Sequence, residues 1–153
     1  MGMKFGEKVP DFTAYDDRGN VFRSSSLIGQ KVVVLYFYPK NFTPGCTKEA
    51  CDFRDYYADF KRLGAEIIGV SSDSSSSHER FKFKYQLPFK FLADKKGRLR
   101  KLFGVKSLLL GLLPGRETFI IDNNGVLKYR FNSINASSHL NEALKIVKEL
   151  ADG

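Results

Sequence analysis

The sequence predicts an α/β domain, in which helices flank a central mixed β-sheet that also carries an N-terminal β-hairpin. The length of 153 residues suits one domain, so residues 1–153 are expected to form a single unit. Apolar residues make up 42% and charged residues 27%, which are ordinary fractions for a soluble globular protein. Strand-like and helix-like runs alternate along the chain, and this alternation is typical of an α/β fold.

The first half of the chain alternates strand and helix patterns. Phe12 to Tyr15 and Val21 to Arg23 flank an Asp-Arg-Gly-Asn turn, which predicts the hairpin. Lys31 to Tyr38 is β-branched or aromatic on both faces and predicts a central strand that is covered on both sides. Apolar residues at helical spacing predict a helix from about Gly45 to Leu63. Ala65 to Ser71 predicts a second buried strand.

The second half repeats the alternation and ends on a helix. Ser76 and Glu79 stand at capping-box spacing and predict a helix start. The expected elements are a helix from Ser76 to about Tyr85, a strand from Phe89 to Ala93, a short basic helix from Lys96 to Phe103, a hairpin of Glu117 to Ile121 and Val126 to Phe131, and a helix from about His139 to Leu150. Right-handed crossovers would make the first two central strands parallel. Ligand sites in such sheets favour the carboxyl ends of strands, and the segment after Tyr38 is one such end.

Cys46 stands where helix geometry activates a thiol. Thr43 is a good N-cap residue, and Pro44 suits the first helical position because it has no amide proton to leave unpaired. Cys46 then falls in the first turn, where free amide groups and the helix dipole favour the thiolate. Since the thiolate is the form that acts as a nucleophile, Cys46 is the candidate catalytic residue.

Cys51 lies five residues further along the same predicted helix. This spacing corresponds to about 500° of rotation and ~7.5 Å of rise, so the two side chains point roughly 140° apart. The Cα atoms are then expected to lie more than ~7 Å apart, too far for a disulfide without backbone movement. Either the two cysteines never pair, or the helix unwinds to let them pair. The spacing is not Cys-x-x-Cys, which disfavours a thioredoxin-type disulfide exchanger.

Composition bears on the compartment and on the class of partner. Two cysteines without a secretory signal lead us to expect a reducing compartment, the cytoplasm, where a cysteine pair is more often redox-active than structural. No apolar run reaches the roughly 20 residues of a membrane span, so no membrane contact is expected. Lysine and arginine number 25 against 17 acidic residues, a net charge of +8. Six of these cations fall within 95–106 without an acid, and we interpret this basic face as solvated rather than as a nucleic-acid site.

The segment around Cys46 resembles a known active-site motif. Pro39-x-x-x-Thr43-x-x-Cys46 is the pattern of the peroxiredoxins, and the string YFYPKNFTPGCTKEAC at 36–51 is similar to the peroxiredoxin Q or bacterioferritin comigratory protein subfamily. Weaker matches follow in the expected order: Gly6-x-x-Val-Pro-Asp-Phe12, Gly69-Val-Ser-Ser-Asp73, Leu87-Pro-Phe89 and Pro114-Gly-Arg-Glu-Thr-Phe-Ile-Ile-Asp122. The resemblance covers nearly the whole chain and implies a thioredoxin-like fold.

The resemblance implies a thiol-dependent peroxidase that reduces hydrogen peroxide and organic hydroperoxides to water or alcohols, in redox homeostasis and antioxidant defence. Cys46 is the implied peroxidatic nucleophile, which becomes a sulfenic acid. Cys51 is the implied resolving cysteine, which forms a disulfide with Cys46 that thioredoxin or a similar dithiol reduces. Sulfur carries the electrons, so no metal, haem, flavin or other cofactor is expected. The subfamily leans towards monomers, and a monomer is expected here.

Five further residues take roles by the same resemblance. Thr43 matches the threonine whose hydroxyl bonds the thiolate and the peroxide, and Pro39 matches the proline that shields the pocket from water. Arg116 matches the arginine that holds the thiolate and stabilises charge on the leaving oxygen. Gly45 is placed with these three among the substrate-binding residues. Glu49 matches an acidic position one turn after the nucleophile and takes an orienting role, with a solvated helix residue as the alternative.

Other functions stay open at this point. A Cys–His hydrolase needs His78 or His139 beside Cys46, but both follow serines at predicted helix starts and are expected to be exposed. Two cysteines and two histidines show no zinc-like spacing. An insulin-reduction assay distinguishes a general disulfide reductase from a peroxidase. Salt-dependent retention of nucleic acid without peroxide consumption would favour a basic binding module instead. The apolar segment from Leu108 to Leu113 is interpreted as a pocket mouth or a partner contact.

Overall fold

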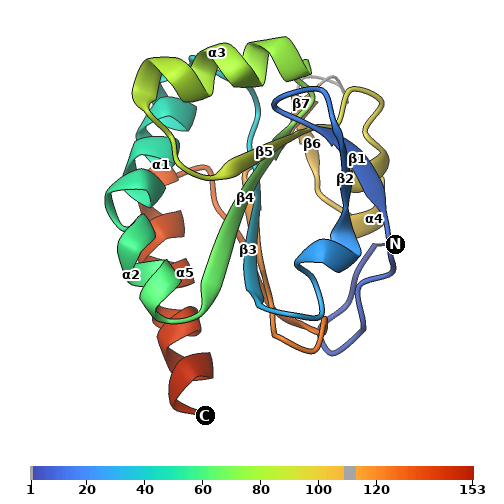
Figure 1. Ribbon diagram of the computed structural model, residues 1–153, viewed down its shortest axis with the longest axis vertical. Coiled ribbons are helices and arrows are strands. Elements are labelled where there is room, and N and C mark those ends of the chain that lie inside the picture. Colours follow the sequence, from blue (N-terminus) through green and yellow to red (C-terminus); the bar gives the residue numbers. More distant parts are fainter. Residues whose placement is uncertain (1, 109–112) are drawn as a thin grey trace.

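The computed structural model describes residues 2–108 and 113–153. Its centre is a seven-stranded sheet of order β2-β1-β5-β4-β3-β8-β9, and β6 and β7 form a separate two-stranded ribbon (Figure 1). The strands are β1 (Thr13–Asp16), β2 (Val21–Arg23), β3 (Val32–Phe37), β4 (Ala65–Ser71), β5 (Lys90–Ala93), β6 (Ser107–Leu108), β7 (Leu113–Pro114), β8 (Glu117–Ile121) and β9 (Leu127–Asn132). The prediction for the apolar segment 108–113 falls on 109–112, outside the described residues.

The sheet combines a parallel centre with antiparallel edges. β3 pairs in parallel with β4, and β4 with β5, so the predicted parallel pairing of the first two central strands is confirmed. β8 runs antiparallel to β3 and forms the predicted hairpin with β9. On the other side, β1 runs antiparallel both to β5 and to β2, its partner in the N-terminal hairpin. This arrangement is the mixed sheet that the sequence predicts.

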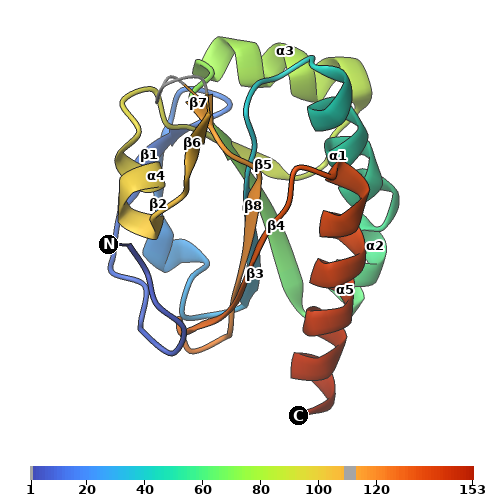
Figure 2. The ribbon, with the colours of Figure 1, turned by 180° about the vertical axis from the view of Figure 1, so that it is seen from behind.

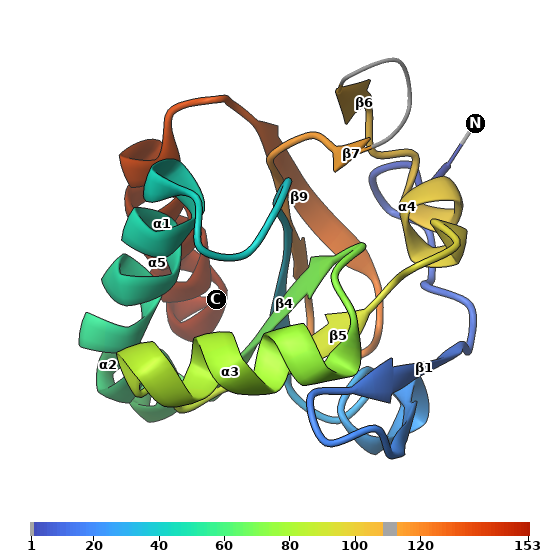
Figure 3. The same cartoon turned by 90° about the horizontal axis from the view of Figure 1, so that it is seen from above.

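Helices cover both faces of the sheet. They are α1 (Pro44–Asp55), α2 (Tyr57–Arg62), α3 (Ser75–Tyr85), α4 (Arg98–Phe103) and α5 (Ala136–Asp152), with a short 3-10 turn at Ser24–Ser26. Figures 2 and 3 show α1, α2 and α5 together on one side of the sheet and α4 on the other. Each side has its own apolar cluster, with Phe53 and Val147 in the first and Leu99 in the second. Among the described residues, no helix is long and apolar enough to cross a membrane.

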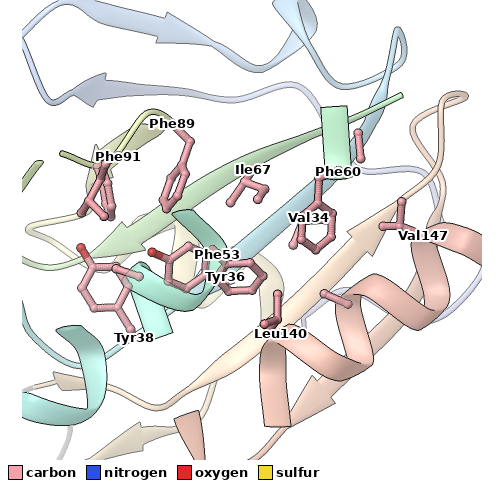
Figure 4. Packing of buried hydrophobic residues seen from close by; sticks show 14 of the residues in the cluster. Val34, Tyr36, Tyr38, Phe53, Phe60, Ile67, Phe89, Phe91, Leu140 and Val147 are labelled. Atoms are coloured by element: carbon pink, nitrogen blue, oxygen red, sulfur yellow. The ribbon is translucent and has the colours of Figure 1, made fainter. Parts of the chain in front are cut away.

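Strand β3 explains how the centre of the sheet is buried on both sides. Successive side chains of a strand point to opposite faces, and on β3 both sets are apolar or aromatic. The side facing α1 and α5 carries Val34, Tyr36 and Tyr38 (Figure 4), and the side facing α4 carries Val33, Leu35 and Phe37. Pro39 follows this run, so the loop 39–43 and the start of α1 lie at the carboxyl edge of the sheet, where the sequence placed the site.

The single helix expected over 45–63 is wrong. It is divided at Tyr56, whose φ of −108° and ψ of 9° separate α1 from α2. Phe53 and Phe60 are seven residues apart and belong to the same buried cluster on either side of the break. Because this spacing also fits an uninterrupted helix, the apolar pattern gives no sign of the division.

The predicted capping residue of α3 is wrong as well. Helix α3 is capped by Ser74, whose Oγ accepts a hydrogen bond from the amide of Ser77 at 3.2 Å. The capping-box spacing predicts Ser76 as the cap with Glu79 as its partner, but Glu79 is exposed. The run of serines before α3 offers several chemically equivalent caps, so the residue types alone could not identify the one used.

Both histidines are buried, so the expectation that they are exposed is wrong. His78 and His139 each have 0% exposed surface. Helix α5 begins at Ala136, three residues earlier than expected, which places His139 within the first turn and not ahead of it. His78 lies in the first turn of α3 in the same way. Each ring therefore packs inward from a helix start at the carboxyl edge of the parallel strands.

Candidate active site

The loop between β3 and α1 is fixed by a buried hydrogen-bond network. The amide of Asn41 donates to Oδ2 of Asp73 at 2.9 Å, and the Asn41 side-chain nitrogen lies 3.0 Å from Nδ1 of His78. Nε2 of His78 lies 3.0 Å from the carbonyl oxygen of Leu92, so this nitrogen donates and Nδ1 accepts. Burial lowers the pKa of His78, which keeps the ring in this neutral form. His78 thus supports the loop 39–43 and does not contact Cys46.

Thr43 and Pro44 begin α1 as predicted, with Thr43 as the N-cap residue and Pro44 in the first helical positions. The Thr43 side chain makes no capping hydrogen bond, because its hydroxyl donates to the carbonyl oxygen of Lys40 at 2.8 Å. Pro39 is half-buried at the start of the same loop. In this conformation the Thr43 hydroxyl is engaged by the loop, and it would have to rotate to donate to Cys46.

Cys46 is buried in the first turn of α1, with 1% of its surface exposed. Nη2 of Arg116 lies 3.4 Å from its Sγ atom, a contact between residues 70 positions apart. Gly45 permits this approach, because a Cβ atom at that position would lie 3.0 Å from Nη2 of Arg116. Gly45, predicted among the substrate-binding residues, therefore makes room for the guanidinium beside the thiol.

Glu49 is 1% exposed, so the alternative of a solvated helix residue is wrong. Its Oε1 atom accepts a hydrogen bond from Nη1 of Arg116 at 2.6 Å. Burial raises the pKa of Glu49 to about 8, because the loss of solvation outweighs the attraction of Arg116. Burial disfavours the charge on Arg116 too, but Glu49 and Cys46 more than offset it and raise the Arg116 pKa above its usual value. The guanidinium is therefore a fixed positive charge between a thiol and a carboxyl group.

A second neighbour of Glu49, His139, was missed by sequence reasoning. Nδ1 of His139 lies 3.7 Å from Oε2 of Glu49 and 2.7 Å from the hydroxyl oxygen of Thr118. Nε2 of His139 lies 2.7 Å from the carbonyl oxygen of Ser133. One signal was available: His139 precedes the buried Ala143 by four residues, a spacing that places both on the apolar face of α5.

Cys51 lies on the same helix as Cys46 but in a different environment. It is a half-buried free thiol, whereas the Cys46 thiol is fully buried. Burial, together with Asp55 and Asp52, raises the pKa of Cys51 above its usual value. Helix α1 is unbroken between the two cysteines, so a disulfide between them requires part of α1 to unwind.

The basic face lies on the opposite side of the sheet from α1, at and around α4 (Figure 3). Lys95, Lys96 and Arg98 are exposed and line a hollow of about 430 Å³ together with Tyr15 and Val21 of the hairpin. No cluster of three or more histidine, cysteine or acidic side chains suited to a metal ion occurs in the part of the chain that the structure describes.

Comparison with known proteins gives a consistent family. The profile of the AhpC/TSA family matches residues 5–130. The chain is 48% identical over 146 residues to the chloroplastic peroxiredoxin Q of Oryza sativa subsp. japonica, a match that covers 95% of this chain and 67% of the rice protein. The structure of peroxidoxin BcpB from Mycobacterium tuberculosis superposes with a TM-score of 0.89 at 36% identity, covering 97% of this chain and 98% of the other. The bacterioferritin comigratory protein of Xanthomonas campestris, described with an alkyl peroxide reduction activity, gives a TM-score of 0.83 at 28% identity over 92% of each chain.

Proposed function

The chain belongs to the AhpC/TSA family and is a peroxiredoxin, a thiol peroxidase of thioredoxin-like fold, and from this premise we propose that Cys46 is the thiol that the hydroperoxide oxidises. The observation that carries the proposal is the 3.4 Å contact between Sγ of Cys46 and Nη2 of Arg116. A cation held beside a thiol favours the thiolate, which is the reactive form. The pKa of the other cysteine, Cys51, is raised, which favours its unreactive thiol form.

Peroxide reduction at this site is a displacement at oxygen. The Cys46 thiolate attacks one oxygen of the hydroperoxide, the O–O bond breaks, and the leaving alkoxide or hydroxide takes up a proton as alcohol or water. Two electrons pass from sulfur to the peroxide, and Cys46 becomes a sulfenic acid. Arg116 stabilises the charge as it moves from sulfur to the leaving oxygen. Its Nη2 atom is already at the sulfur, and its buried Nε atom has no hydrogen-bond partner among the described residues.

Cys51 resolves the sulfenic acid in the proposed cycle. Its sulfur attacks Sγ of Cys46, a disulfide forms, and the sulfenic oxygen leaves as water. In a helix, residues five apart are separated by ~7.5 Å of rise, beyond the ~7 Å Cα separation that a disulfide spans. Unwinding of α1 between the two cysteines is therefore a step of the cycle. Thioredoxin or a similar dithiol then reduces the disulfide by exchange and restores both thiols.

The remaining predicted residues support the same step. We propose that the Thr43 hydroxyl, once it has rotated, donates a hydrogen bond to the thiolate or the peroxide. We propose that Pro39 excludes water from the loop side of the site. Gly45 leaves space for the guanidinium, and Glu49 orients it through the 2.6 Å contact to Arg116. Glu49 and Gly45 are thus positioning residues, Pro39 shields the site, and Thr43 and Arg116 contact the reacting atoms.

Hydrogen peroxide and small organic hydroperoxides are the proposed substrates, and the alkyl peroxide reduction described for the Xanthomonas campestris relative supports the second class. Cys46, Glu49 and Arg116 come from one chain, so we propose an active monomer, which sedimentation of the reduced protein tests. Two free thiols suit a reducing compartment, and we propose the cytoplasm. The rice relative is chloroplastic, which makes an organelle the alternative location.

Intact mass after one equivalent of hydrogen peroxide, with and without an alkylating trap, tests the cycle. A loss of about two mass units, with both cysteines protected from the trap, is the expected disulfide. In Cys51→Ser, a gain of about sixteen mass units at Cys46 is the expected sulfenic acid. Cys46→Ser should abolish thioredoxin-linked peroxide consumption, and full activity in this variant would overturn the assignment of Cys46.

A further inference from the structure

We propose that His139 is a positioning residue for the reaction of Cys46 and acts through Glu49 and Arg116. The inference rests on the proposed role of Cys46. The side chains form one continuous buried series: Sγ of Cys46 lies 3.4 Å from Nη2 of Arg116, Nη1 lies 2.6 Å from Oε1 of Glu49, and Oε2 lies 3.7 Å from Nδ1 of His139. None of the four residues is more than 9% exposed.

The hydrogen bonds of His139 define where its proton lies. Nε2 is 2.7 Å from the carbonyl oxygen of Ser133, and because a carbonyl can only accept, Nε2 carries a proton. Nδ1 of the neutral ring is then a lone pair, and it accepts from the Thr118 hydroxyl at 2.7 Å. The same lone pair is 3.7 Å from Oε2 of Glu49, an oxygen without a hydrogen-bond partner among the described residues. The free oxygen of the Glu49 carboxyl group therefore faces a ring nitrogen that can take up a proton once the Thr118 hydroxyl turns away.

The pair formed by Glu49 and His139 shares one proton at neutral pH. Burial raises the pKa of Glu49 to about 8, whereas burial, assisted by Arg116 but opposed by the Ser133 carbonyl, lowers the pKa of His139. The proton therefore resides mainly on Glu49. Its transfer from Oε2 of Glu49 to Nδ1 of His139 leaves the net charge of the pair unchanged. Only loss of the proton from the pair as a whole creates an additional negative charge in the site.

That additional charge matters because Arg116 contacts both Cys46 and Glu49. With the proton present, the guanidinium balances a single anion, the Cys46 thiolate. Once the proton is lost, the Glu49 carboxylate competes for the same guanidinium at 2.6 Å. A further negative charge close to an acid raises the pKa of that acid, by about one unit or more in close pairs. With its neutral ring facing Oε2, His139 favours the protonated form of Glu49 and so keeps the charge of Arg116 available to Cys46.

The other groups around the pair do not replace His139. Asp52, on α1, is negative and raises the pKa of Glu49. The pKa of Tyr36, on β3, is raised well above its usual value, mainly by burial, so its phenol remains neutral. On the β9 side, the Phe131 ring packs against His139 with a centroid distance of 5.0 Å and brings no charge. Within the described residues, Arg116 and the neutral ring of His139 are the basic groups that lie within 4.0 Å of the Glu49 carboxyl oxygens.

The test measures the alkylation rate of Cys46 against pH, with no peroxide present, in a Cys51→Ser background so that one thiol reacts. His139→Gln is the first variant, because a glutamine amide can still donate to the Ser133 carbonyl but offers no base to Glu49. We expect its midpoint to move upward by about one pH unit, the lower end of the shift that a nearby like charge causes. In a Glu49→Gln background, where no carboxylate can form, adding His139→Gln should produce no further shift.

Three outcomes would overturn the proposal. The first is an unchanged Cys46 alkylation midpoint in His139→Gln, and the second is an equal shift of this midpoint in the presence and absence of Glu49. The third is a midpoint in His139→Asn equal to that of the protein with His139, because the asparagine oxygen accepts a hydrogen bond near the Nδ1 position but binds no proton. Tyr129→Phe is the matched control, since it removes the 2.9 Å bond to Glu142 between β9 and α5 and should lower stability without moving the midpoint. Failure of the peroxidase proposal would appear separately, as activity retained in Cys46→Ser.

Discussion

The two cysteines of α1 share one helix but differ in chemical environment. Cys46 is fully buried and lies 3.4 Å from the guanidinium of Arg116, the residue that directly precedes β8. Cys51, about one and a half turns later, is half-buried, and its burial and the neighbouring aspartates raise its pKa. The difference arises from a residue 70 positions away in sequence from Cys46. The helix start places Cys46 among free amide groups, and an arginine distant in sequence gives this cysteine, and not Cys51, a neighbouring cation.

Removing the Arg116 guanidinium should remove most of the difference in reactivity between Cys46 and Cys51. It is expected to have the largest effect among our predictions. Arg116→Met should lower the rate constant for oxidation of Cys46 by hydrogen peroxide by about 10²-fold, the usual cost of losing one transition-state donor. The alkylation rate of Cys51 should stay unchanged. Rapid-mixing kinetics with limiting peroxide in a Cys51→Ser background measure the first rate, and alkylation in a Cys46→Ser background measures the second.

Arg130→Met is the control for Arg116→Met. Arg130, on β9, is a partly buried arginine that pairs with Glu117 at 2.7 Å, so its loss tests the general effect of removing a buried cation from this end of the sheet. The oxidation rate should be close to that of the unmodified protein. Equal losses in the two variants would show that Arg116 acts through folding rather than at the sulfur.

Local rules predicted the position of Cys46, because they involve only neighbouring residues. Thr43 and Pro44 carry the signal of a helix start, and that signal places Cys46 in the first turn wherever the rest of the chain lies. The strand at Ala65–Ser71 was also predicted with the observed bounds, since burial on both sides leaves a run that is apolar except for Glu66 and is ended by polar residues. The break at Tyr56 preserves the apolar period and for that reason has no sequence signal.

The contacts across the site could not be derived from local rules. No pattern near position 116 indicates that its guanidinium reaches Cys46, and Arg116 was identified through the family motif alone. The burial of Glu49 and the position of His139 depend on how α5 packs against α1 and β8, a tertiary arrangement that residue types do not specify. The serines before His139 suggested an exposed cap, whereas Asn135 caps α5. Sequence reasoning thus found the proposed nucleophile, and the structure added the contacts that join it to Arg116, Glu49 and His139.

A smaller effect is expected from the helix between the two cysteines. Lys48 is exposed, so Lys48→Gly and Lys48→Ala both remove its ion pair with Asp52 and differ mainly in helix propensity. Glycine disfavours the helix by about 1 kcal/mol relative to alanine, which is roughly a fivefold change in the population of the unwound segment. Disulfide formation after a peroxide pulse should therefore be about fivefold faster in Lys48→Gly. Quenched-flow alkylation measures this rate, and equal rates in the two variants would mean that unwinding of α1 does not limit it.

The smallest expected effect is a change in the titration of Cys51, which tests the second half of the comparison. In Cys46→Ser, the alkylation midpoint of Cys51 should lie above the ~8.5 of an ordinary thiol, because the folded state holds its proton more tightly. The corresponding stability is present below ~8.5 and is lost as pH rises through the folded-state pKa, so the urea midpoint should fall in that window. Cys51→Ser in the same background should remove this part of the pH dependence.

The raised pKa of Cys51 in the folded helix also fits its proposed role as the resolving cysteine. Burial in the folded helix is the first cause of the raised pKa of Cys51, so unwinding of α1 both brings Cys51 within reach of Cys46 and lets its thiolate form at lower pH. The Cys51 alkylation midpoint in urea should therefore drop toward ~8.5, while the folded midpoint stays above it. A folded midpoint at or below the urea value would show that Cys51 is already activated within the helix, and the contrast between the two cysteines would then rest on Arg116 alone.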